Sequence, residues 1–325
     1  MRILVTGAGG FIGSNLVGAL LEAGGLEQPD GRWEPLTELV LVDWTAFAEP
    51  DAPAGVTLVT RQGDICDPAV RQAVFERPVD VIFHLAATLT AEAQADPVKA
   101  TRVNVRGFLD LLDACRSLHA PPRFVFASSI ATYGGDLPET VDDGVVQTPQ
   151  TSYGAHKVIA EQLINDYTRH GVIDGRALRL PIVLVREPGR APSVSDQVAA
   201  IVREPLAGRD TICPFRADTC LTVASVQHVA HSLLKVAALP AGAFGATRAM
   251  NLPALTTTPA KMIAAVNAIG KDRGLGTVSY ELDEAAQAVV DGWPRRFVSE
   301  RATRAGLRSE DAFESIVEAY IAAGA

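Results

Sequence analysis

The chain has 325 residues, of which 48% are apolar, so it can bury the core of one large domain or two. Its formal net charge of −9 argues against a positively charged surface that would bind nucleic acid or an anionic membrane. No stretch reaches the about 18 uninterrupted apolar residues of a membrane span. Because the first predicted strand starts at residue 2, we expect no leader sequence and a cytoplasmic protein.

The cysteines and histidines predict neither a disulfide framework nor a metal centre. The four cysteines form no C-x-x-C pair, and the six histidines add no complementary ligand spacing. His228 and His231 stand three residues apart on a predicted helix and could bind a metal, but a solvated helix face explains them better. We therefore expect reduced, structural thiols and no metal.

The opening residues predict a strand, a glycine turn and a helix. Arg2 to Thr6 is an apolar run typical of a buried parallel strand, and Gly7, Gly10 and Gly13 follow at a spacing of three. An amphipathic helix comes next, so a pyrophosphate could lie over its N-terminus, where unpaired N–H groups favour negative charge. The alternative is a tight turn that binds no ligand.

Strand-like runs alternate with helical patterns through the first 180 residues. This alternation predicts an α/β fold of the Rossmann type, with a doubly wound parallel sheet covered on both faces. The further strands are expected at 37–43, 56–61, 79–85, 123–128 and 176–180, and the helices at 97–118, at 153–169 and from Pro68.

Beyond Leu180 the alternation of strand-like and helical patterns stops, because five prolines interrupt residues 181–217. A strand and helix at 221–238 and a strand at 248–252 are expected to rejoin the sheet. We therefore predict a nucleotide-binding domain of residues 1–180 with 218–252, and a smaller, interleaved C-terminal lobe for substrate of 181–217 with 253–325.

Two acidic residues follow predicted strands in the nucleotide-binding half. Asp43 ends the second strand, where a carboxylate can accept hydrogen bonds from both ribose hydroxyls and repel a 2′-phosphate, which favours NAD over NADP. It lies 30 residues after Gly13, more than the usual ~20, because a polar loop expected at 24–36 intervenes. Asp64 is a candidate for the adenine edge. Either residue could instead be a solvent-facing strand end or a helix cap.

The chemistry-bearing pattern is TSYGAHK, after the fifth strand. Tyr153 and Lys157 are four residues apart, so on a helix they share one face. A lysine cation favours the phenolate of a nearby tyrosine and so allows acid–base chemistry near neutral pH. Ser128 and Ser129 end the preceding strand; since successive side chains point to opposite sides, only one of them can be catalytic. Serine is also a common turn former, which is the competing interpretation.

These motifs, TGAGGFIG, HLAA, NVRG, FASSIATYGG and SYGAHK, stand in an order and spacing that resemble an extended short-chain dehydrogenase/reductase. That group includes nucleotide-sugar epimerases and dehydratases. The resemblance covers residues 1–180 and implies NAD as cofactor and the catalytic set Ser129, Tyr153 and Lys157. The cofactor positions that it implies, besides Tyr153 and Lys157, are Gly7, Gly10, Phe11, Ile12, Gly13, Asp43, Asp64, Ile65, Leu85, Ala86, Ala87 and Asn104.

The second half departs from the sugar-nucleotide members. Its segments VREPGR, RAMNLPAL and WPRRF resemble NAD-dependent dehydrogenases that oxidise the C2 hydroxyl of the four-carbon sugar acid D-erythronate to a 2-oxo acid. A guanidinium is needed for the substrate carboxylate, and Arg190, ahead of Arg186, is the candidate. The expected substrate positions are Thr88, Ser128, Ser129, Tyr153 and Arg190.

Three functions remain open at this point. An oxidising dehydrogenase is the leading expectation, and an epimerase or dehydratase with tightly bound NAD is the enzymatic alternative. The intact Ser–Tyr–Lys set argues against a non-catalytic NAD-responsive protein. The family analogy also implies a homodimer through helices 97–118 and 153–169.

Overall fold

The computed structural model describes residues 1–185 and 193–324. The chain divides into two compact units, each built from segments that are distant in the sequence. The first comprises Met1–Ser129, Thr151–Arg179 and Ala230–Met250, and the second comprises Ile130–Gln150, Leu180–Val229 and Asn251–Ala325.

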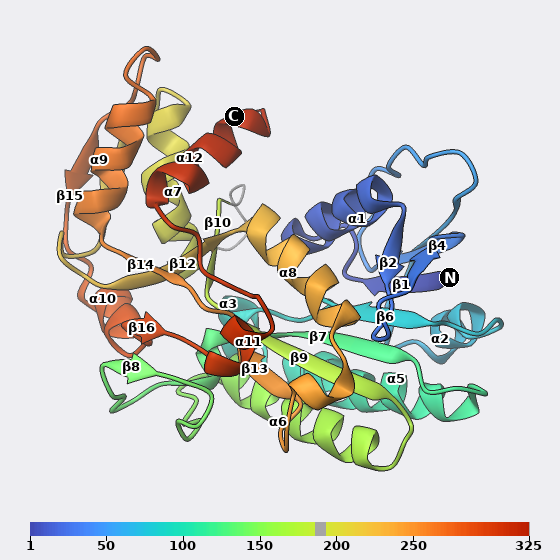
Figure 1. Ribbon diagram of the computed structural model, residues 1–325. Helices are drawn as coiled ribbons and strands as arrows, with labels where there is room; N and C mark the ends of the chain where they lie inside the picture. The colour runs from blue at the N-terminus through green and yellow to red at the C-terminus, as the bar shows by residue number, and fades with distance from the viewer. Residues whose placement is uncertain (186–192, 325) are drawn as a thin grey trace. The chain divides into compact units, whose positions relative to one another are not determined.

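A seven-stranded sheet forms the centre of the first unit, in the order β13-β9-β7-β6-β1-β4-β5 (Figure 1). Strand β1 pairs in parallel with both β4 and β6, so the strand order reverses beside β1. In such sheets ligands bind at the carboxyl ends of the strands beside this reversal. The strands are β1 (Arg2–Thr6), β4 (Glu38–Asp43), β5 (Thr57–Gln62), β6 (Val81–His84), β7 (Arg123–Ser129), β9 (Asp174–Leu180) and β13 (Ala249–Asn251).

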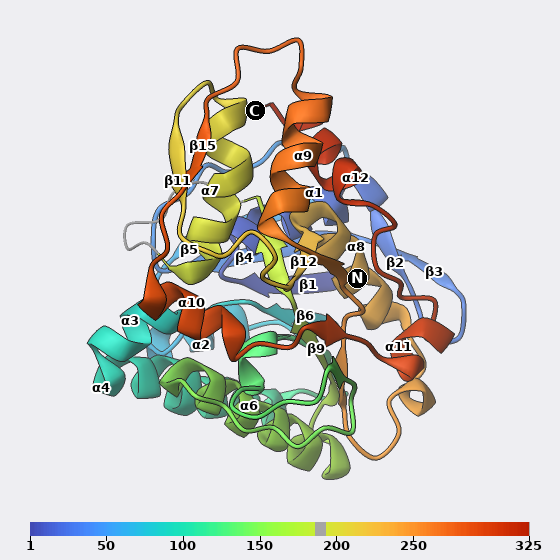
Figure 2. The same ribbon diagram turned by 90° about the vertical axis from the view of Figure 1, so that its left-hand side faces the viewer.

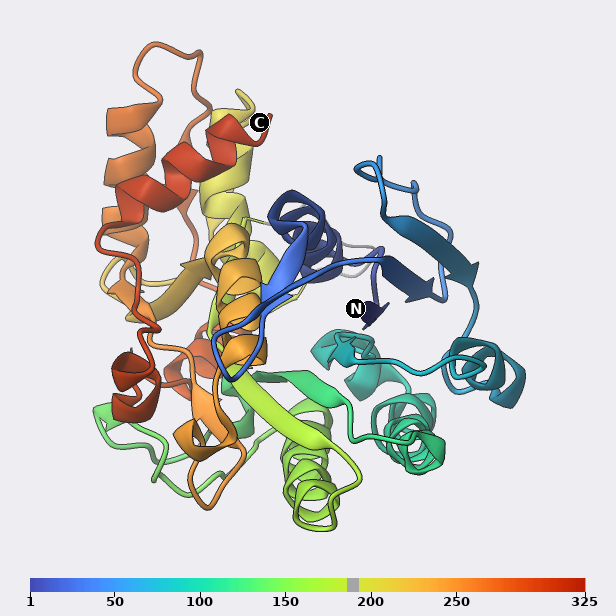
Figure 3. The same cartoon turned by 45° about the vertical axis from the view of Figure 1, so that its right-hand side comes forward.

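Helices cover both faces of this sheet, as the alternating pattern predicts (Figures 1 and 3). One face carries α1 (Phe11–Ala23) and α8 (Val226–Ala238), which belongs to the first unit from Ala230 onward. The other carries α2 (Pro68–Val74), α5 (Phe108–Ala114) and α6 (Ser152–Arg169), whose apolar residues share one core with the strands. The predicted doubly wound Rossmann architecture is confirmed.

The single helix expected at 97–118 is wrong in detail. Short helices α3 (Thr90–Ala95) and α4 (Pro97–Thr101) are followed by a π-helical turn at Arg102–Gly107, then α5 and a 3-10 turn. Such wide turns are rare and are frequently found at functional sites. Here a Cβ at Gly107 would lie 2.2 Å from the Cys66 sulfur, so the chain approaches its neighbour more closely than a side chain allows.

The stretch 24–36 is not the expected loop but a hairpin. Strands β2 (Gly25–Glu27) and β3 (Trp33–Pro35) pair antiparallel, and Gly31 takes the left-handed conformation in the turn. Strands of three residues with a proline carry too little alternation to be recognised from sequence.

The second unit contains three small sheets. Strands β10 (Ile182–Leu184), β12 (Leu221–Ser225) and β14 (Leu255–Thr257) form one; β11 (Thr211–Cys213) pairs with β15 (Val278–Tyr280), and β8 (Thr140–Val141) with β16 (Arg296–Phe297). Helices α7 (Val194–Leu206) and α9 (Pro259–Ile269) lie side by side (Figure 2), and α12 (Phe313–Ala322) packs on α9. The remaining helices are α10 (Glu284–Asp291) and α11 (Glu300–Arg304).

The compact units differ from the expected division at two places. Residues 130–150 lie in the second unit, and the strand expected to rejoin the central sheet at 221 instead pairs with β10 and β14. Local pattern cannot tell which sheet receives a strand, because pairing depends on distant segments. The assignment of the units to cofactor and substrate stays a prediction.

Two features of the described part of the chain concern membranes and metal ions. No helix there combines the length and apolarity needed to cross a bilayer. Nor does this part hold a group of three or more His, Cys, Asp or Glu side chains that could bind a metal ion, and its four cysteines are free thiols.

Candidate active site

The glycine turn between β1 and α1 leaves no room for side chains. Gly7 has a φ of +73°, and a Cβ there would lie 2.7 Å from the nitrogen of Ala86. A Cβ at Gly13 would lie 2.0 Å from the carbonyl oxygen of Gly7, which allows α1 to start directly against the turn. Gly10 is the N-cap, so no side chain caps the helix. Phe11 and Ile12 then form its first turn, partly buried.

Asp43 joins the end of β4 to this turn. Its Oδ2 accepts a hydrogen bond of 3.0 Å from the Gly9 amide, and its Oδ1 accepts from the Thr45 amide and hydroxyl at 3.0 and 2.9 Å. An ionised carboxylate offers about four acceptor positions, so roughly one remains, on Oδ2. Asp43 therefore has room for one ribose hydroxyl, and not for the pair of hydroxyls expected from its position at the strand end.

Asp64 and Ile65 lie after β5, with different surroundings. Asp64 accepts from the Cys66 amide at 2.9 Å and pairs with Arg102 at 2.7 Å. Burial raises the pKa of Asp64, but these two partners outweigh it and hold the pKa below its usual value. The Ile65 side chain is buried in the core, so only its backbone could face a ligand.

Asn104 holds the loop that follows β6. Its Oδ1 accepts from the Thr88 amide at 2.8 Å and its Nδ2 donates to the Thr88 carbonyl at 2.9 Å. The other end of this loop, at Leu85 and Ala86, lies against Gly7. Asn104, a poor helix former, is thus explained by a backbone clamp on the 85–88 loop, which includes Ala87.

The predicted catalytic side chains come together at the end of β7 and the start of α6. Ser129 is the last residue of β7, and its side chain is hydrogen-bonded to that of Tyr153. Lys157 follows one helical turn later, and its ammonium donates to the Ala127 carbonyl at 2.7 Å. The Lys157 nitrogen lies 5.4 Å from the centre of the Tyr153 ring.

The electrostatics of this group in the free protein differ from the expected phenolate. Burial raises the pKa of Tyr153 to about 12, although the Ser129 hydrogen bond opposes this. Burial also lowers the pKa of Lys157 to about 7, with the Glu161 carboxylate opposing it. Tyr153 is therefore a neutral phenol near pH 7, and its proton leaves readily only when positive charge is added nearby.

Ser128 points away from this group and into the interior. Its hydroxyl donates to the carboxylate of Glu161, which also pairs with Arg179 at 2.7 Å. Ser128 is 2% exposed and its hydroxyl belongs to a buried ion-pair network, which argues against the expected substrate contact. Ser129 is the serine that contacts Tyr153.

The residues present fit NAD. The bare glycine turn and the start of α1 without a side-chain cap form a cradle that any Cβ at Gly7 or Gly13 would fill, as a pyrophosphate requires. Asp43 stands at the strand end beside this cradle with one acceptor position left. Lys157 adds a buried cationic group on the same unit.

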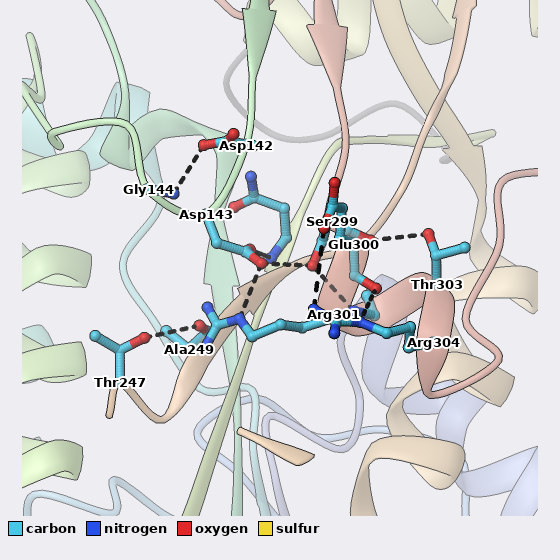
Figure 4. A network of polar contacts seen from close by, with 12 residues as sticks. Asp142, Asp143, Gly144, Thr247, Ala249, Ser299, Glu300, Arg301, Thr303 and Arg304 are labelled. Carbon is cyan, nitrogen blue, oxygen red and sulfur yellow. Dashed lines mark hydrogen bonds and ion pairs between the residues drawn. The ribbon is translucent and has the colours of Figure 1, made fainter. Parts of the chain in front are cut away.

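In the second unit, a network around Asp143 anchors the 130–150 segment (Figure 4). Asp143 accepts from the Asn251 amide at 2.7 Å, from the Ser299 hydroxyl at 2.6 Å and from Arg301 at 3.1 Å. Asn251 in turn accepts from the Tyr133 hydroxyl at 3.1 Å. The chain between Ser129 and Thr151 is thereby tied to the start of α11. The expected carboxylate ligands Arg190 and Arg186 lie outside the described residues.

Two side chains near the site were not anticipated from the sequence. Glu161 is four residues beyond Lys157, a helical spacing that places an acidic residue on the buried face of α6 and could have marked it. His84 at the end of β6 hydrogen-bonds to Thr6 at 2.7 Å, and burial lowers its pKa to about 3. Its neighbours Thr6, Phe108, Phe124 and Phe126 come from two strands and a helix, and no local pattern marks such a position.

Comparison with known proteins agrees with this geometry. The sequence model of the NAD dependent epimerase/dehydratase family matches residues 3–217. D-erythronate dehydrogenase from Cupriavidus necator is 37% identical over 99% of this chain and 98% of its own length. D-erythronate dehydrogenase from Haemophilus influenzae is 30% identical over 99% of both chains.

A solved structure shares the fold over the whole chain. The crystal structure of the nucleoside-diphosphate-sugar epimerase from Agrobacterium tumefaciens is 32% identical and has a TM-score of 0.89, covering 100% of this chain and 94% of its own. The resemblance to extended short-chain dehydrogenases, the expected enzyme class and the NAD cofactor are confirmed. The chain therefore belongs to the NAD-dependent epimerase/dehydratase family and is an NAD-dependent oxidoreductase.

Proposed function

We propose that this protein oxidises the C2 hydroxyl of a small sugar acid, D-erythronate in the first place, to the 2-oxo acid. The observation that carries the proposal is the hydrogen-bonded Ser129–Tyr153 pair with Lys157 one helical turn further on. Two relatives named D-erythronate dehydrogenase match nearly the whole chain, including the part beyond residue 217 that the family model leaves out. Their identity over nearly the whole chain supports a sugar acid as the substrate.

Ser129, Tyr153 and Lys157 have different roles in the proposed oxidation. Ser129 hydrogen-bonds the substrate hydroxyl and keeps its oxygen near Tyr153, which removes the hydroxyl proton as general base. Lys157 in its cationic form stabilises the phenolate of Tyr153. NAD, held by the glycine turn, Asp43 and Lys157, would supply a positively charged ring that favours the phenolate and an acceptor for the hydride of the carbinol carbon. The hydroxyl proton and this hydride together account for the oxidation of alcohol to ketone.

The substrate carboxylate needs a guanidinium, and we propose Arg190 ahead of Arg186 for this role. A bidentate arginine fixes the orientation of a carboxylate, which selects the hydroxyl that faces Tyr153. Arg190→Met should raise KM for the sugar acid by about ten- to a hundredfold while kcat falls less, since the charge-assisted pair is worth ~1.5–3 kcal/mol. Equal KM values for the wild type and this variant would exclude Arg190.

The test is NADH formation from NAD across a panel of four- to six-carbon aldonates and UDP-sugars. We expect D-erythronate, or a near relative with a C2 hydroxyl, to reduce NAD, and the Tyr153→Phe variant to be inactive with the same compound. Turnover of a UDP-sugar with every short aldonate inert would overturn the proposal.

A second candidate is epimerisation or dehydration of a nucleotide sugar with NAD kept bound. It is favoured by the whole-length similarity to the nucleoside-diphosphate-sugar epimerase. The panel separates the two, because an epimerase converts its substrate without net formation of NADH.

We further propose a cytoplasmic homodimer that pairs through the helices at 97–118 and 153–169. Exposed apolar side chains at Val98 and Ile159 on these helices support it. Light scattering should give the mass of a dimer, and Ile159→Arg should shift it toward the monomer.

A further inference from the structure

Asn104 and Thr88 fix the orientation of an amide next to the catalytic helix. The backbone N–H of Thr88 donates to the Asn104 Oδ1, and the Thr88 carbonyl accepts from the Asn104 Nδ2. Backbone donors and acceptors cannot be exchanged, so they decide which end of the amide is nitrogen. The Nδ2 of Asn104 therefore has one further hydrogen to place.

That hydrogen points to His156. The Asn104 Nδ2 lies 3.4 Å from the Nδ1 of His156, so this ring nitrogen has to be the acceptor. The Nε2 lies 3.3 Å from the Thr101 hydroxyl, whose own proton goes to the Pro97 carbonyl at 2.8 Å. Only a neutral imidazole protonated on Nε2 satisfies both contacts.

The clamp acts on the loop beside the glycine turn. Leu85 and Ala86, at one end of the 85–88 loop, lie against Gly7, and Thr88, at the other end, is held through both of its backbone groups by Asn104. His156 immediately precedes Lys157 on α6, so this contact joins the catalytic helix to the loop.

We propose that His156 is a positioning residue, whose neutral imidazole orients Asn104 and thereby holds the 85–88 loop against the glycine turn that receives NAD. The inference rests on NAD as the cofactor and not on the proposed substrate. A protonated imidazole would turn Nδ1 into a donor facing the Asn104 donor, so acid should loosen the loop and weaken cofactor binding.

No neighbouring charge competes for this role. Burial lowers the pKa of His156, which keeps the ring neutral at physiological pH. His156 makes no described hydrogen bond or ion pair with the titratable side chains of α6 or of the elements packed against it, namely Glu92, Asp96, Lys99, Arg102, Arg106, Asp110, Asp113, Arg123, Tyr153, Lys157, Glu161, Asp166, Tyr167 and Arg169.

The first experiment uses the unliganded wild-type protein. A long-range ¹H–¹⁵N spectrum of the imidazoles should show His156 as the neutral tautomer with its proton on Nε2 at pH 8. A proton on Nδ1 would overturn the proposal, whatever the variants do.

The second experiment compares two substitutions that differ in one property. His156→Asn offers an acceptor oxygen in place of Nδ1 and does not titrate, whereas His156→Phe offers no acceptor. At pH 8 we expect the Kd for NAD, measured by calorimetry, to rise about fivefold in His156→Phe and to change less than about twofold in His156→Asn. Hydrogen exchange of the 85–88 amides in the free protein should increase in the same order.

The pH profile separates positioning from simple packing. Across the pH range in which the His156 imidazole is seen to titrate in the ¹H–¹⁵N spectrum, the Kd of the wild type should rise at least about threefold more than that of His156→Asn, because only the wild type can protonate this site. His170→Asn, an exposed substitution at the end of the same helix, should keep the wild-type profile. Equal Kd values for the two His156 variants, or parallel pH profiles of wild type and His156→Asn, would overturn the proposal. Failure of D-erythronate to react would leave each of these readouts unchanged.

Discussion

The buried pair of Glu161 and Arg179 permits a quantitative test of what holds the catalytic helix to the sheet. The Glu161 side chain is 1% exposed and that of Arg179 is 6%, and their closest atoms are 2.7 Å apart. Glu161→Gln keeps the shape but removes the negative charge, so the guanidinium of Arg179 loses its ion pair with Glu161 while it stays buried. Breaking a buried pair in this way costs about 3–5 kcal/mol, and we expect the free energy of unfolding of the first unit to fall by that amount.

Replacing both partners should cost much less than replacing one. Glu161→Leu with Arg179→Met removes both charges together, and such exchanges are often close to neutral. The hydroxyl of Ser128 then loses its acceptor, at about 1–3 kcal/mol, unless Ser128→Ala is added. We expect the triple variant to be more stable than either single charge variant, with a coupling energy between Glu161 and Arg179 of at least ~2 kcal/mol.

Native-state hydrogen exchange of the β7 and α6 amides is the suitable assay, because it measures opening of the first unit without assuming that both units unfold together. Arg169→Met is the matched control. It removes an exposed ion pair with Asp166 on the same helix and should change stability by less than ~1 kcal/mol. If Glu161→Gln cost no more than this control, or if the coupling energy were zero, the network would not hold the helix in the way we describe.

Three further predictions concern the site itself. Tyr153→Phe should lower kcat by more than tenfold and leave the Kd for NAD within a few-fold of the wild-type value. Because burial raises the pKa of the Tyr153 phenol to about 12, the oxidation rate of the wild type should rise with pH above 7. A rate that does not change with pH would contradict the role of Tyr153 as the base. Asp43 should favour NAD over NADP by at least ~2 kcal/mol in kcat/KM, and comparable values for the two cofactors would remove it from that role. Gly13→Ala should abolish NAD binding in calorimetry, because the new methyl group would lie 2.0 Å from a carbonyl oxygen, whereas Gly18→Ala on the same helix meets open space and should bind normally.

The sequence alone predicts the elements whose signal is local. The apolar run from Arg2, the glycines at 7, 10 and 13 and the helix that follows need no distant partner to be recognised. The spacing of Tyr153 and Lys157 likewise follows from one helical turn. Because these signals are local, the Rossmann architecture, the enzyme class and the cofactor can be inferred from the order of residues along the chain.

Contacts between distant segments lie beyond such patterns. Strand alternation predicts only that Ser128 and Ser129 point to opposite sides, and the packing of α6 against β7 decides that one meets Glu161 and the other Tyr153. The strand at 221–225 has the composition of a central strand, yet it pairs with β10 and β14 in another sheet. Pairing and register depend on which edges are available.

For the residues around the site, too, the sequence predicts the position on an element but not the contacts that the side chain makes. Helical periodicity places Asn104 and His156 on their helices, but it does not reveal that one clamps the backbone of Thr88 and the other orients the clamp. A buried polar side chain is stable only when its hydrogen-bonding groups are satisfied, and its partners are set by the order of the strands and the closeness of the helices. Composition and spacing thus determined the fold class and chemistry of this protein, while the tertiary structure decided which polar groups carry them.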